Sequence, residues 1–360
     1  MQRNYIKSHA SLRGFAALLV VIYHMQFGSH VRLFWEVGFF RRGYLWVDLF
    51  FILSGFVISY TAGLGRHGWP EIKAFWQARF ARIYPLHFFA LTLLVAVIAV
   101  ETIVGNLFGK AMVNPQQWSS GSLVTLALQY TLLNGLFGQE GWNIPSWSIS
   151  TEAVAYALFP LIALGKRWPY VVAAIAFYLW VGATTGVLDI VSGVAVLRCL
   201  AGFSLGMAIC AARDRIAQLR FLGALQLVGL AFALIAMITG WNDVVAIPGF
   251  VLLVAATWTD RGVLCVPLKW PALVWLGDVS YSVYLNHFWV LEAWHFVASR
   301  ALPRLGFDDA TARSIEIGFG LVAVLVVSHV TWRWVEMPTR KYLLAKWRAR
   351  PALVDRNPAP

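Results

Sequence analysis

The stretch RGFAALLVVIYH, residues 13–24, is an apolar segment with an ionisable residue at each end. It lies in an apolar run of about 18 residues, long enough to cross a bilayer as a helix. Arg13 and His24 are eleven positions apart, and at about 100° per residue eleven steps return to within about 20° of the starting direction. The two side chains therefore share one helix face, about 16 Å apart along the axis.

Ionisable side chains inside a membrane span are costly, so they usually face a protein interior or a water-filled cavity. Arg13 and His24 are therefore a candidate site. The alternative is structural: Arg13 snorkels to the lipid headgroups, and His24 forms a hydrogen bond with a neighbouring helix.

The composition of the chain is that of a membrane protein. Of its 360 residues, 59% are hydrophobic and only 13% are charged, whereas a soluble domain carries about 25% charged residues. The net charge of +12 comes from Lys and Arg in short loops between apolar runs. We attribute it to topology and to contact with anionic lipids or an anionic substrate, and not to nucleic acid. The three cysteines lack metal-ligand spacing, so no metal is expected.

Ten apolar runs of spanning length predict an all-α integral membrane protein. A further run, about 122–137, is rich in Thr, Gln and Asn and predicts a short re-entrant or interfacial segment. The inner loops hold roughly three times as many Lys and Arg as the outer loops, which predicts that both termini are cytoplasmic. We expect one membrane domain, residues 1–338, and a basic cytoplasmic tail, residues 339–360. The ten runs are about 11–28, 44–62, 85–104, 146–165, 168–187, 193–212, 222–240, 243–260, 272–297 and 313–335.

Two acidic residues are expected at the same depth as His24. Asp48 stands near the outer end of the second span, where it is a candidate partner of His24 or a helix N-cap. The following Ser54-Gly55 predicts a close approach of another backbone. Glu152 enters the fourth span from the outer side, about two turns deep. A carboxylate beside a histidine is a common acid–base arrangement, although the sequence does not show that these residues meet.

A pair of arginines precedes the third span. Arg79 and Arg82 are three positions apart, so they share a helix face and suit a phosphate group or, alternatively, lipid headgroups. Pro85 predicts the start of a helix there.

The ninth span carries Tyr281, Tyr284 and His287 at one-turn spacing. Such a polar stripe indicates contact with a substrate or hydrogen bonds between helices.

Six segments now stand in an order that resembles the membrane acyltransferase-3 family, over about residues 11–338. They are Arg13 with His24, the VDLFFILSGF span, the arginine pair followed by IYPL, the WSISTE segment, SYSVYLNH, and the closing VEMP. The resemblance implies a ten-helix inner-membrane enzyme that transfers an acyl group, most often acetyl from acetyl-CoA. The implied acceptor is a hydroxyl of a cell-envelope or exported polysaccharide, a lipopolysaccharide or a similar glycan. The chain looks like the stand-alone form, without a periplasmic esterase-like domain.

The resemblance also implies roles for particular residues. Arg13 and His24 correspond to the essential pair. From their placement in the spans, and not from the resemblance, Glu152 and Asp48 are further catalytic candidates that would orient the imidazole or serve the acceptor hydroxyl. His24 would act as a general base or would itself take the acyl group. Arg79 and Arg82, with Tyr84 beside them, would contact acetyl-CoA. Candidate contacts with the acceptor are Trp147, Ser150, Tyr281, Tyr284 and His287.

Two alternatives stay open at this point. The same fold can use another donor, such as succinyl-CoA, or a non-glycan acceptor. A different class of protein, a transporter of acyl groups or lipid-linked sugars, would also line its path with buried polar residues. Inverted internal repeats with broken spans are typical of many transporters, and we see none in the sequence.

Overall fold

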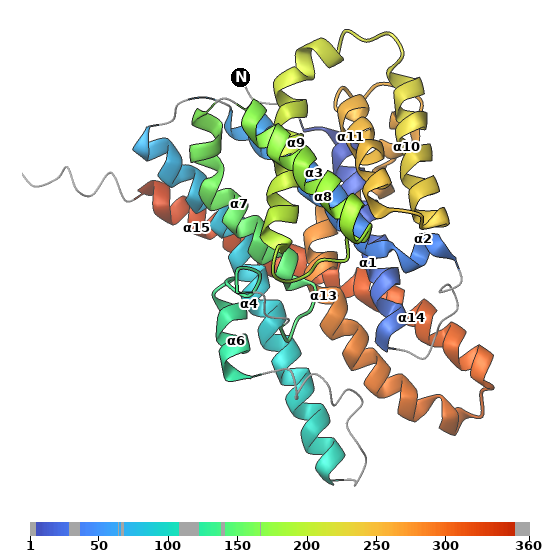
Figure 1. Ribbon diagram of the computed structural model, residues 1–360. Coiled ribbons are helices and arrows are strands. Elements are labelled where there is room, and N and C mark those ends of the chain that lie inside the picture. The colour runs from blue at the N-terminus through green and yellow to red at the C-terminus, as the bar shows by residue number, and fades with distance from the viewer. Residues whose placement is uncertain are drawn as a thin grey trace, which may run out of the picture.

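The computed structural model describes residues 5–28, 37–63, 65, 68–107, 122–137, 141–165 and 167–349 (Figure 1). Within these ranges the only regular secondary structure is helical. The predicted all-α fold class is therefore confirmed. The last residues of the predicted tail, 350–360, lie outside the described residues.

Six helical segments are long and apolar enough to cross a membrane. Two shorter apolar helices are α8 (Trp168–Thr184) and α11 (Ala246–Thr257), which η2 (Asp243–Val245) precedes. The two remaining predicted runs are α1 (Lys7–Gly28) and α13 (Pro271–Ala301). Each of the ten runs thus coincides with a helix, while ten crossings and cytoplasmic termini stay predictions. The six segments are Gly43–Ala62 (η1, Gly43–Leu45, with α3, Trp46–Ala62), α4 (Trp69–Leu107), α7 (Ser146–Leu164), α9 (Ala195–Ile216), α10 (Leu222–Thr239) and Asp309–Arg348.

Helix α4 is continuous over 39 residues, and Pro85 lies inside it. The prediction that Pro85 begins a helix is therefore wrong. Proline is tolerated inside membrane helices where other helices pack against the backbone around it. Helix α13 packs on this stretch of α4, and Tyr281 donates a hydrogen bond to the carbonyl of Ile83 at 2.7 Å. Because the helix does not break, Arg79 and Arg82 belong to the same rigid element as the span that follows them.

The C-terminal segment continues the last span. Helix α14 (Asp309–Thr331) passes through one π-helical turn, η4 (Trp332–Glu336), into α15 (Met337–Ala349). Helix α15 lies along the first half of α4, where the rings of Trp347 and Phe80 are 6.2 Å apart. The described part of the predicted tail is therefore a helix packed against the body.

Glycines allow three pairs of helices to approach closely. A Cβ on Gly55 of α3 would lie 2.0 Å from the carbonyl oxygen of Phe203 in α9, and one on Gly206 would lie 2.0 Å from that of Ile52. Small residues permit this packing between membrane helices. The predicted close approach at Gly55 is confirmed. The other two pairs are Gly14 with Gly277, between α1 and α13, and Gly229 with Gly249, between α10 and α11.

The polar run at 122–137 forms α6 (Leu123–Tyr130), a helix of eight residues. At 1.5 Å per residue it is about 12 Å long, too short to cross a bilayer. Gln129 fastens it to the body, because its amide donates to the carbonyl of Asn143 at 3.0 Å and to Ser146 at 2.9 Å.

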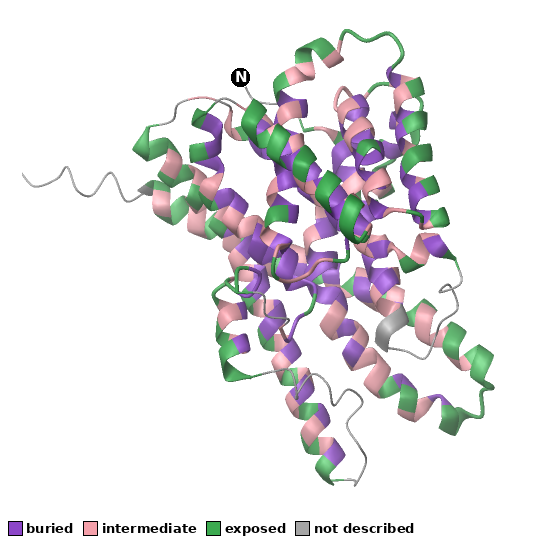
Figure 2. Cartoon of the chain, in the orientation of Figure 1, coloured by how far each residue is buried: buried purple, intermediate pink, exposed green. Residues whose placement is uncertain are grey.

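Burial is concentrated where α1, α3, α7, α9 and α13 meet, and the outward faces of α8 and α10 are exposed (Figure 2). Four short elements complete the described chain: α2 (Gly38–Arg41), α12 (Cys265–Leu268), η3 (Pro303–Leu305) and the turn η4 described above.

Candidate active site

A cavity of about 110 Å³ lies between α1, α3, α4, α7 and α13. Its apolar lining comes mainly from α3, with Ile83 of α4 and Ile149 of α7. Its polar lining collects predicted site residues from four distant segments. These polar residues are Arg13, Ser54, Arg79, Arg82, Ser148, Glu152, Tyr156, Ser280, Tyr281 and Tyr284.

Glu152 is held by two hydroxyl groups. Ser54 and Tyr156 each donate to the same carboxylate oxygen, Oε1, at 2.5 Å, and their own oxygens are 3.0 Å apart. Ser54 was expected to serve helix packing, but its side chain turns to Glu152 instead. Tyr156 was missed, although its i+4 spacing from Glu152 on α7 was a usable signal.

Guanidinium groups outnumber carboxylates at this cavity. Arg82 forms an ion pair with Glu336 of η4 and lies 5.2 Å from the ring of Tyr281. Arg13, Arg79 and Arg340 are all close enough to act electrostatically on Arg82. We call these four arginines the arginine cluster; Glu152 and Glu336 are the carboxylates beside it. The unbalanced positive charge suits a polyanionic ligand.

His24 lies farther along α1 and is paired with His287. The Nδ1 atom of His24 is 3.2 Å from Nε2 of His287 and 3.0 Å from the carbonyl oxygen of Val20. The Nδ1 atom of His287 is 3.2 Å from the carbonyl of Val283. A carbonyl only accepts hydrogen bonds, so this network assigns the protons to both Nδ1 atoms. The Nε2 atom of His24 then carries the lone pair that a base or nucleophile needs.

The polar stripe on α13 joins the cavity to His24. Tyr281 and Tyr284 line the cavity, and Tyr284 makes a 2.7 Å hydrogen bond with Ser148. One turn later, the ring of His287 is 6.0 Å from that of Tyr284. The structure therefore brings these three predicted contacts into one continuous line, from the arginine cluster to His24.

Asp48 is engaged elsewhere. Its carboxylate accepts two hydrogen bonds from Arg198, at 2.6 and 3.1 Å, and both side chains are 0% exposed. Arg198 also donates to the carbonyls of Tyr44 and Ile190. Sequence reasoning missed Arg198, whose signal was its position as a lone charge inside an apolar run. The geometry gives no support to Asp48 as a partner of His24.

Three further candidates make structural contacts. Trp147 faces the guanidinium of Arg198 at 5.3 Å. Ser150 donates to the carbonyl of Leu132 at 2.6 Å and accepts from the amide of Gly135 at 3.0 Å. The ring of Tyr84 stacks on Phe80 at 4.7 Å. None of the three is among the residues that line the cavity, so their roles at substrates stay predictions.

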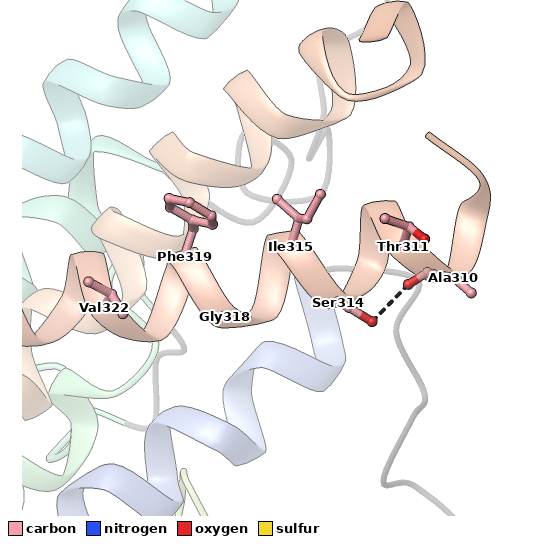
Figure 3. A pocket seen from close by; sticks show the side chains of 7 residues that line it. All are labelled: Ala310, Thr311, Ser314, Ile315, Gly318, Phe319 and Val322. Atoms are coloured by element: carbon pink, nitrogen blue, oxygen red, sulfur yellow. Dashed lines mark hydrogen bonds between the residues drawn. The ribbon is translucent and has the colours of Figure 1, made fainter. Parts of the chain in front are cut away.

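A second, shallow depression runs along one face of α14 (Figure 3). Its lining comes from a single helix and holds no titratable side chain. The hydroxyl of Ser314 is turned back to the carbonyl of Ala310 at 2.9 Å. A surface of this kind does not assemble chemistry from several elements, so it is not a candidate active site. Its lining residues are Ala310, Thr311, Ser314, Ile315, Gly318, Phe319 and Val322.

Comparison with known proteins matches residues 10–333 to an acyltransferase domain family. The chain is similar to the acyltransferase MdmB of Streptomyces mycarofaciens, with 26% identity over 98% of this chain and 96% of that protein. It is 23% identical to the peptidoglycan O-acetyltransferase OatA of Listeria monocytogenes over 94% of this chain, which spans 56% of that protein. No solved structure matches the chain. The chain therefore belongs to this acyltransferase family and is an O-acyltransferase.

Proposed function

We propose that this protein transfers an acetyl group from cytoplasmic acetyl-CoA to a hydroxyl of a cell-envelope or exported glycan. The observation that carries the proposal is the cavity that brings Arg13, Arg79 and Arg82 together with Glu152, and from which the polar side chains of α13 lead to the pair of His287 and His24. The acceptor class rests on OatA, whose name states transfer of acetyl to the glycan peptidoglycan. Under this proposal the protein is a multi-pass protein of the inner membrane, with α15 and the first half of α4 on the cytoplasmic side.

The donor fits the charge of the site. Coenzyme A carries phosphate groups, and guanidiniums bind phosphate through charge-assisted, often bidentate hydrogen bonds. The nucleotide would bind at arginines of the cluster that are not paired with a carboxylate, and the thin arm that carries the thioester would extend along Tyr281 and Tyr284 toward His24.

His24 would act as the general base. Its Nε2 takes the proton of the acceptor hydroxyl while that oxygen attacks the thioester carbon. The carbon–sulfur bond then breaks, and the leaving thiolate takes the proton from the imidazolium. His287 accepts a hydrogen bond from Nδ1 of His24 and so keeps the lone pair on Nε2. The same lone pair can take the acetyl group itself, and release of coenzyme A without acceptor would distinguish this covalent route.

The test is the variant His24→Ala. General base catalysis contributes about 10²- to 10⁴-fold in rate, so we expect at least about a hundredfold loss of transfer with normal membrane insertion. Transfer is measured as thiol release from acetyl-CoA and as O-acetyl signals of the envelope glycan in NMR spectra. The matched control is His329→Ala, because His329 is exposed and its ring packs beside Trp275 and Trp332, away from the cavity lining. Full activity in His24→Ala would contradict the proposal.

A further inference from the structure

The two arginines that precede the third span have different surroundings, although their spacing makes them look equivalent. Arg82 forms an ion pair with Glu336, whose side chain is 1% exposed and accepts a 2.8 Å hydrogen bond from Ser282. Arg79 lies between the rings of Phe75 and Tyr156, at 5.9 and 6.0 Å. Its buried Nε has no hydrogen-bond partner among the described residues.

Glu336 reaches Arg82 because of the π-helical turn between α14 and α15. A π turn adds one residue to a helical turn and is frequent at functional sites. In η4 the side chains of Arg333 and Trp334 are exposed, whereas Glu336 is buried. The turn therefore directs the only acid of the segment inward, toward α4 and α13.

This ion pair changes how charge is distributed in the arginine cluster. A buried guanidinium that is paired with a buried carboxylate is close to neutral as a unit, and removing either partner leaves the other uncompensated. Arg79 has no such partner among the ion pairs of the described residues. Arg340 follows Glu336 by four residues on α15, so it lies on the same side of the helix. It is close enough to Arg79 for the two to repel each other.

We propose that Arg79 and Arg340 bind the phosphates of the donor, and that Glu336 is a positioning residue which holds Arg82 as a fixed part of the cavity wall. The inference rests on the proposed function, because that function supplies a donor with phosphate groups. It assigns the phosphate site to a pair that bridges α4 and α15. It also gives the C-terminal helix a role in donor binding.

The experiment is a double-mutant cycle read by donor KM, by kcat and by the melting temperature. Arg82→Gln and Glu336→Gln should each lower the melting temperature, since each leaves a buried charge unpaired. The double variant should regain most of that loss and keep its donor KM within about threefold of wild type. Arg79→Gln and Arg340→Gln should each raise the donor KM by about ten- to a hundredfold, the value of a hydrogen bond to a charged group, with the melting temperature unchanged. Arg333→Gln, an exposed arginine of the same turn, is the matched control.

Two results would overturn the inference. The first is a double variant whose donor KM rises as much as that of Arg79→Gln, because Arg82 would then bind phosphate itself. The second is an unchanged donor KM in Arg340→Gln.

Binding of coenzyme A alone separates this inference from the proposed function. If acyl transfer is absent but coenzyme A raises the melting temperature of the wild type and not of Arg79→Gln, the phosphate site stands and the proposed reaction fails. If coenzyme A does not stabilise the wild type, both the donor and the phosphate site are overturned.

Discussion

Two groups of buried charge in this protein are built in opposite ways. Between α3 and α9, one carboxylate, Asp48, meets one guanidinium, Arg198, whose other N–H groups donate to backbone carbonyls. In the arginine cluster, Arg13, Arg79 and Arg82 line a cavity whose lining holds one carboxylate, Glu152, and Glu336 pairs with Arg82. The first group is complete within the protein. The second has more positive than negative side chains around its cavity, and this difference supports the proposed donor site.

The largest effect on stability should come from breaking the balanced pair. Asp48→Asn leaves the guanidinium of Arg198 buried without its counter-charge, which should reduce the free energy of unfolding by about 3–5 kcal/mol. Arg79→Gln should not reduce it, because it removes a like-charge neighbour of Arg340. Denaturant unfolding in detergent measures both variants. Equal losses in the two would show that the two groups do not differ as described.

The helices and several residues of the cavity were predicted from the sequence. The spans could be predicted from the hydrophobic runs alone. A helix in lipid makes all of its backbone hydrogen bonds within itself, so its sequence is sufficient to predict it. The spacing of three residues predicted that Arg79 and Arg82 share one helix face. The lack of a side chain at Gly55 predicted the close approach of another helix. The positions of Glu152 and of the α13 stripe at one cavity agree with the segments that carried the family resemblance.

The sequence could not decide which charges meet across helices. Asp48 and Arg198 are 150 positions apart, and the depth of Asp48 fitted His24 equally well. The partner of His24 turned out to be a second histidine, His287. The ion pair of Glu336 depends on a π turn, whose one-residue change of register has no reliable sequence signal. Such pairings are set by tertiary packing, which local patterns do not encode.

A smaller effect should follow from separating α3 and α9. Helix α3 carries Asp48 into the balanced pair and Ser54 into the cavity, so both groups depend on its position. Gly55→Ala places a methyl group against the backbone of Phe203, and overpacking of this kind costs about 1–3 kcal/mol.

The matched control is Gly318→Ala in α14, where the added Cβ meets no atom of another helix within 4 Å among the described residues. It should leave the melting temperature unchanged or slightly higher, because alanine favours a helix. If Gly55→Ala is as stable as this control, the close packing of α3 on α9 does not hold the Asp48–Arg198 pair and the cavity in place.

The smallest effect should come from a charge outside both groups. Asp308 caps α14, accepting hydrogen bonds from the amides of Ala310 at 3.0 Å and Thr311 at 2.9 Å. The backbone hydrogen bond from Thr311 lowers the pKa of Asp308 below its ordinary value. The stabilisation is therefore present above the unfolded pKa of about 3.9 and is lost as the pH falls through the folded pKa.

Asp308→Ala should lower the melting temperature slightly at pH 7, and the difference from wild type should shrink in acid. Asp308→Asn keeps an acceptor for the cap, so its melting temperature at neutral pH should lie between those of the wild type and Asp308→Ala. A loss at Asp308 as large as that of Asp48→Asn would mean that carboxylates matter equally wherever they lie, and the contrast between balanced and unbalanced charge would fail.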